Sequence, residues 1–179
     1  MFASFVQGPL VRVIPLGLIL LALQRTIFVE IQIDGVIIPI MMAMSAAAGV
    51  AGGSERGAVV GFTLGIMFDL AEGTPLGSTA TAMTIAGAVG GLLALIAADP
   101  HWWLEAIFAA LGTAAGVVMV PLLRGFIGEA EPFQRQLGVV VAVSAVAAAV
   151  LSPLFVPLGR WCLRMRRPEW KQPVGDTSS

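Results

Sequence analysis

The chain has 179 residues, of which 58% are apolar and only 12% are charged, and its formal net charge is −1. A soluble protein carries about 25% charged residues, so this composition excludes an ordinary soluble enzyme and a disordered chain. The near-neutral charge argues against nucleic acid as a partner, and the single cysteine, Cys162, cannot form an internal disulfide. The composition therefore indicates a protein embedded in a lipid bilayer.

Long apolar runs divide the chain into six segments that can cross a bilayer as helices. A hydrocarbon core of about 30 Å takes about 20 helical residues, and a helix satisfies its own backbone hydrogen bonds in lipid. The segment 57–72 is short, and a re-entrant hairpin is the alternative to a full crossing there. We predict an all-α integral membrane protein with six transmembrane helices in a compact bundle. These helices are expected at residues 10–29, 35–53, 57–72, 77–98, 103–126 and 137–159.

The connections between the predicted helices are too short to hold a soluble domain. Residues 54–56 are expected to form a polar turn, and residues 72–77 carry glycine and proline turn chemistry. Residues 1–160 are therefore predicted to be one membrane domain, followed by a basic, disordered cytoplasmic tail at 161–179. Because lysine and arginine concentrate on the cytoplasmic side, the basic tail predicts that both termini are cytoplasmic.

Glycines recur every fourth residue around the second and third predicted helices. Residues four apart share one helix face, and glycines there allow another backbone to approach closely. The face could pack inside the bundle or could dock a partner's helix, and the spacing does not separate the two. The glycines are Gly49, Gly53, Gly57, Gly61 and Gly65.

Asp69 is the acidic residue that the sequence singles out, near the end of the predicted span 57–72. An ionisable group in a membrane is costly, which makes it a candidate for a relay, a ligand contact or a partner contact. The alternative is a structural role near the end of the helix, as a cap or in a pair with Arg25, which the predicted topology places on the same outer side. We therefore expect Asp69 either to act in a relay, a ligand contact or a partner contact or to stabilise the fold locally.

Catalytic and metal-binding patterns are not apparent in the sequence. His101 is the only histidine, too few for a histidine-rich zinc site, and no local motif marks a nucleophile to accompany it. We predict no cofactor, no metal and no enzymatic activity.

The residues around Asp69 resemble a known family. The run Gly57–Leu70 reads GAVVGFTLGIMFDL and is followed by GTPLG at residues 73–77, and LQRT stands upstream at residues 23–26. In this order and spacing, together with Asp34, Gly35 and Pro39, the motifs resemble the rod shape-determining protein MreD family over residues 18–95.

The resemblance implies a multi-pass protein of the bacterial inner (cytoplasmic) membrane that regulates cell shape. It would bind MreC and, with it, control the peptidoglycan synthase formed by RodA and a class B penicillin-binding transpeptidase. The implied fold resembles the substrate-binding component of energy-coupling-factor transporters, and no catalysis is implied. The implied partner-contact or structural residues are Arg25, Gly57, Gly61, Gly65, Asp69, Gly73, Pro75 and Gly77.

A small-molecule-binding membrane component of a transporter is the alternative function. Such a protein needs a cavity with a few convergent polar groups. The sequence offers candidates for these groups, but it does not show that they converge. They are Gln24, Asp69, Thr74, Ser78, Thr79 and Thr81.

Overall fold

The computed structural model describes residues 10–28, 32–33, 36–96, 100–127 and 137–163. These residues are helical apart from two paired strands of two residues each. The elements are α2 (Leu10–Leu23), the π-helix η1 (Gln24–Phe28), β1 (Gln32–Ile33), β2 (Val36–Ile37), α3 (Ile40–Gly52), α4 (Ser54–Glu72), α5 (Ser78–Gly90), α6 (Leu93–Ile96), α7 (Trp102–Ile127) and α8 (Leu137–Leu163).

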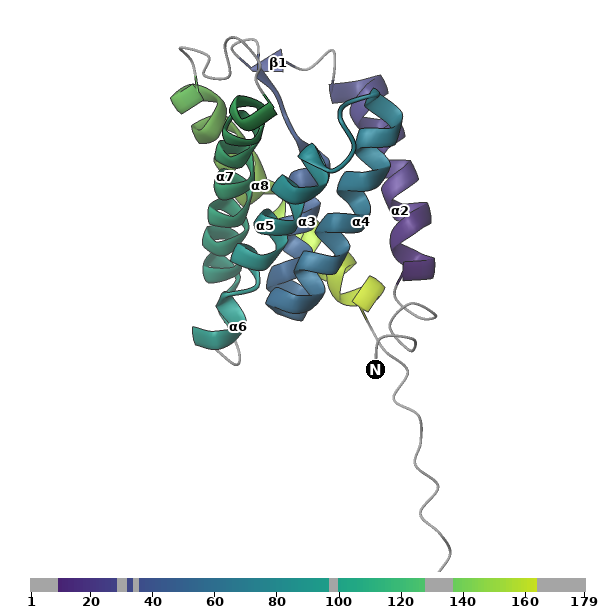
Figure 1. Cartoon of the computed structure of the whole chain (residues 1–179). Helices are drawn as coiled ribbons and strands as arrows, with labels where there is room; N and C mark the ends of the chain where they lie inside the picture. Colours follow the sequence, from purple (N-terminus) through teal and green to yellow (C-terminus); the bar gives the residue numbers. More distant parts are fainter. Residues whose placement is uncertain (1–9, 29–31, 34–35, 97–99, 128–136, 164–179) are drawn as a thin grey trace, which may run out of the picture.

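Helix α3 is the centre of the bundle. Every residue from Ile40 to Val50 is buried, and α4, α5, α7 and α8 all contact α3. Successive helices run in alternating directions, with the α3–α4 corner at one end and the α4–α5 turn at the other (Figure 1). Helix α2 lies at the edge, where Val13, Gly17 and Leu20 form the buried stripe that faces the other helices.

The predicted second span, residues 35–53, begins too early. Val36 and Ile37 pair with β1 as a short hairpin, and α3 begins at Ile40. The reason is Pro39, which disfavours a helical conformation at the residue before it and therefore marks the start of α3. The turn expected at residues 54–56 is also wrong, because Gly53, with φ +87°, separates α3 from α4.

The predicted span at 77–98 is interrupted within its last turns. Helix α5 ends at Gly90, and the short helix α6 follows a turn. At Gly91 the chain crosses the α3–α4 corner so closely that a Cβ there would lie within 3.0 Å of backbone atoms of Ser54 and Gly53. This crossing accounts for the break.

Residues 161–163, expected in the tail, belong to α8 instead, and residues 164–179 lie outside the described residues.

Within the residues that the structure describes, three helical segments are long and apolar enough to cross a membrane. They comprise residues 78–96, Trp102–Leu123 and Leu137–Leu163. Large apolar side chains cover the outside of the bundle on α2, α7 and α8, as expected of a surface that faces lipid. The structure thus fits a membrane protein by the length, the composition and the surface of its helices.

Candidate functional site

Asp69 caps the following helix. The side chain is 1% exposed, and its Oδ1 accepts hydrogen bonds from Thr74 Oγ1 (2.8 Å) and from the backbone N–H of Thr79 (3.2 Å). Its Oδ2 accepts from the backbone N–H groups of Gly77 (2.9 Å) and Ala80 (3.3 Å). The first N–H groups of a helix lack partners within the helix, and Gly77 at the N-cap of α5 has no side chain to supply one. Asp69 supplies this cap from the last turn of α4.

The turn between α4 and α5 is shaped by glycine and proline. Gly73 ends α4 with φ +68° and Gly77 precedes α5 with φ +99°, a left-handed conformation that glycine adopts without steric cost. Neither position has an atom within 4 Å of where a Cβ would lie. Pro75 lies between them, and its carbonyl accepts a hydrogen bond from the N–H of Ser78 (3.1 Å). Gly73 and Gly77 are thus required by the backbone conformation that brings Asp69 to α5.

The predicted pair between Arg25 and Asp69 is wrong. Arg25 Nε donates to Glu72 Oε1 at 2.9 Å, and Arg25 Nη2 donates to the carbonyl oxygen of Ala71 at 2.8 Å. The carbonyls of the last turn of α4 are free to accept a cation, whereas the Asp69 carboxylate turns inward and is already satisfied by α5. The other part of the expectation, a carboxylate that caps locally, is confirmed.

Gln24 caps the start of α3, a role that the sequence did not suggest. Its Oε1 accepts a hydrogen bond from the backbone N–H of Met41 (3.3 Å), in the first turn of α3. Pro39, the N-cap residue of α3, provides no side-chain hydrogen bond to that helix. Gln24, Arg25 and Asp69 therefore complete the ends of α3, α4 and α5 on the same side of the bundle (Figure 1). Such caps matter in lipid because the bilayer core offers no water to unpaired backbone groups.

The glycines of α4 form the seam between α4 and α5. A Cβ at any of the three positions would come closer than 3.0 Å to α5 backbone atoms, a distance that real Cβ atoms essentially never show. The two helices therefore pack backbone against backbone, and this face is used inside the bundle. The glycines are Gly57, Gly61 and Gly65, and their nearest neighbours on α5 are Gly87, Met83 and Ala80 respectively.

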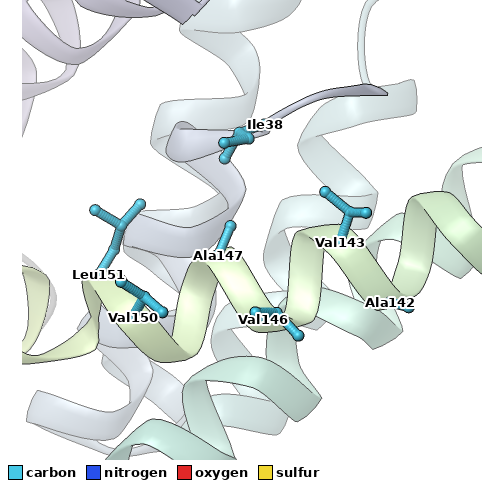
Figure 2. Close-up of a pocket in the computed structure, with 7 residues that line it drawn as sticks. All are labelled: Ile38, Ala142, Val143, Val146, Ala147, Val150 and Leu151. Carbon is cyan, nitrogen blue, oxygen red and sulfur yellow. The ribbon is translucent and has the colours of Figure 1, made fainter. Parts of the chain in front are cut away.

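An apolar groove of about 460 Å³ lies along the outside of α8 (Figure 2). Ile38, just before α3, stands across from the helix, and the α8 side chains that line the groove recur at helical spacing. Val146 and Val150 are 64% and 70% exposed. Among the described residues no polar side chain lines the groove, so these residues do not provide the convergent polar groups of a small-molecule site. Its lining residues are Ile38, Ala142, Val143, Val146, Ala147, Val150 and Leu151.

Four of the six polar side chains predicted for a ligand cavity make hydrogen bonds within the fold instead. Gln24, Asp69 and Thr74 make the capping contacts described above, and the hydroxyl of Thr81 donates to the carbonyl of Gly77 (2.6 Å). In the part of the chain that the structure describes, no group of three or more His, Cys, Asp or Glu residues could hold a metal ion. His101 is exposed just before α7, and Cys162 is buried.

Comparison with other proteins gives no match to this chain, whether with family models, with curated sequences or with solved structures. The family resemblance of residues 18–95 therefore stays a prediction from sequence motifs.

Proposed function

We propose that the chain is a six-span protein of the bacterial cytoplasmic membrane that acts as a non-enzymatic scaffold of the MreD type. The crossings would be α2 with η1, α3, α4, α5 with α6, α7 and α8, and both termini would be cytoplasmic. The alternating directions of these helices support six crossings (Figure 1). Arg12 near the start of α2, Arg56 near the start of α4 and Arg160 near the end of α8 lie at the same end of the bundle. The distribution of positive charge supports this orientation.

In this proposal the chain binds the membrane anchor of MreC. Together they would bias the RodA–transpeptidase synthase toward its active arrangement. The observation that carries the proposal is the apolar groove along α8, which the described residues leave open. Ala142 to Leu151 covers about 14 Å of helix at a 1.5 Å rise, and the small side chains of Ala142 and Ala147 there allow another helix to approach closely.

In this proposal the motif residues stabilise the fold, and a different surface binds the partner. Gly57, Gly61, Gly65 and Asp69 are buried against α5, so we assign them to folding. Partner binding is then assigned to the outward surface of α8. This arrangement suits a scaffold, because the elements that hold the bundle together do not compete with the surface that docks the partner.

Capture of MreC by the purified, tagged chain tests the proposal. We expect the wild-type chain to retain MreC in mild detergent. The Val146→Trp variant, whose larger side chain fills the groove, should retain much less MreC. Leu18→Trp is the matched control, because Leu18 is similarly exposed (57%) on α2, away from the groove. A stable wild-type preparation that captures no MreC would contradict the function, and equal capture by both variants would contradict the docking surface.

A further inference from the structure

The end of the bundle opposite the α4–α5 turn gathers arginine and tryptophan side chains. Arg12 lies in the first turn of α2, Arg56 in the first turn of α4 and Trp161 in the last turn of α8. Trp102 and Trp103 begin α7 at the same end. In Figure 1 the start of α2 and the end of α8 lie at this end. Cations and tryptophans together are typical of a membrane–water interface.

Arg12 is held against Trp161 by two contacts. Arg12 Nη1 donates to the backbone carbonyl of Trp161 at 3.1 Å, and Arg12 Cζ lies 5.3 Å from the centre of the Trp161 ring. A guanidinium has five N–H donors in a rigid fork, so this bond leaves most of them for another acceptor. The guanidinium lies over the ring, and Trp161 itself is 55% exposed.

The positive charge at this end is not balanced within the described residues. Arg25 pairs with Glu72 at the other end, and here Arg160 pairs with Glu105. No ion pair within the described part of the chain involves Arg12 or Arg56, and Glu55 is exposed beside Arg56. Arg56 lies beside the last turn of α8, because the side chains of Arg56 and Leu163 are both neighbours of Gly52, and Trp161 belongs to that same turn.

We propose that Arg12, Trp161 and Arg56 form a binding site for the phosphate of an anionic phospholipid in the adjacent leaflet. Arginine binds phosphate through parallel N–H bonds, and an exposed indole beside it suits the headgroup region of a bilayer. A lipid fits better than a soluble phosphate because the cations lie at the rim of an apolar helix bundle. This site depends on the membrane insertion proposed above but not on the binding of MreC.

Retention of phosphatidylglycerol by the full chain tests the site. We expect native mass spectrometry to show more retained phosphatidylglycerol than phosphatidylcholine on the wild-type chain. Arg12→Gln should weaken this binding about fivefold, the typical contribution of one cation near an anionic surface. Arg12→Lys keeps the charge but loses the parallel N–H bonds, so its binding should be weaker than that of the wild type and stronger than that of Arg12→Gln. Arg25→Gln is the matched control, because Arg25 lies at the opposite end and is paired with Glu72.

Three results would overturn the site. The first is equal retention of the anionic lipid by the wild type, Arg12→Gln and the double variant Arg12→Gln/Arg56→Gln. The second is equal retention of phosphatidylglycerol and phosphatidylcholine by the wild type. The third is displacement of phosphatidylglycerol by millimolar inorganic phosphate, which would indicate a site for soluble anions. If Arg12→Gln fails to fold, Arg56→Gln alone should still weaken phosphatidylglycerol binding, and unchanged binding would likewise overturn the site.

Discussion

The α4–α5 seam and the edge helix α2 show two different ways of joining helices in one bundle. At the seam, Gly61 meets the backbone of Met83, which cannot move without the helix itself. At the edge, Gly17 of α2 faces the side-chain ends of Leu64 and Met67 on α4, and these can rotate away. The seam is therefore rigid and intolerant of added volume, whereas the edge can adjust.

The bundle also contains two kinds of helix surface, those that are buried against other helices and those that are exposed on its outside. Helix α3 is buried along its length, and the glycine face of α4 is covered by α5. By contrast, α2 and α8 present large apolar side chains outward. A partner that binds within the membrane can reach these outer helices without disturbing the seam.

The largest expected effect comes from adding one methyl group at the seam. Gly61→Ala should force α4 and α5 apart and cost about 2–3 kcal/mol, as overpacked cores do, which exceeds the gain of up to about 1 kcal/mol in helix propensity. Gly17→Ala should change stability by less than about 1 kcal/mol, because propensity offsets a small side-chain shift. Thermal unfolding in mild detergent measures both variants.

Gly138→Ala is the matched control, since a Cβ at Gly138 has no atom within 4 Å. If Gly61→Ala and Gly17→Ala unfolded at the same temperature, the difference between the rigid seam and the adjustable edge would be wrong.

The next largest effect is expected at Asp69. Asp69→Ala should cost about 2–4 kcal/mol, because each buried donor that loses its acceptor costs about 1–3 kcal/mol. Asp69→Asn keeps the shape of the side chain and one acceptor oxygen, so it should lower the free energy of unfolding by less. Thermal unfolding gives the size of the loss, and faster amide hydrogen exchange at Thr79 and Ala80 would locate it at the start of α5.

Glu72→Ala is the control for Asp69, because Glu72 is an exposed acid in the same turn of α4. An Asp69→Ala variant as stable as Glu72→Ala, with unchanged exchange at Thr79, would rule out the capping role.

The smallest effect is expected from the ion pair between Arg25 of η1 and Glu72 of α4. Arg25→Glu and Glu72→Arg should each lower the unfolding temperature slightly, since exposed pairs contribute little and are screened by salt. The double swap Arg25→Glu/Glu72→Arg should recover the loss at low salt. Arg25→Glu/Asp69→Arg should not recover it, and recovery there would favour the pair that the structure contradicts.

The sequence predicted the helices better than it predicted how their ends are held. Apolar runs located α7 and α8 closely, because length and hydropathy decide whether a segment can span a bilayer. The glycine spacing in α4 correctly indicated a close helix contact, and the structure identifies α5 as the neighbour. The break after Gly90 was missed, because it results from a crossing with the α3–α4 corner that lies far away in sequence.

The roles of Asp69 and Arg25 required the relative rotation of the helices, which the sequence does not contain. Both residues were placed correctly at the same end, yet a rotation of α4 decides whether Asp69 faces outward to Arg25 or inward to α5. The absence of a capping side chain at Gly77 and Pro39 was a signal that could have been used. A helix that begins without its own cap needs an acceptor from elsewhere, and Asp69 and Gln24 supply it.

The Asp69 cap also bears on the order in which the chain can assemble. All four of its hydrogen-bond donors lie within 11 residues of Asp69 along the chain, whereas the contact from Arg25 to Glu72 spans 47 residues. Contacts between near neighbours close with a smaller loss of chain entropy and form sooner. The Asp69 cap can therefore form once Ala80 has been synthesised, and the hairpin of α4 and α5 can be completed when the chain reaches Gly90, the end of α5. The earlier segment carrying Arg25 can then pack against a hairpin that is already formed.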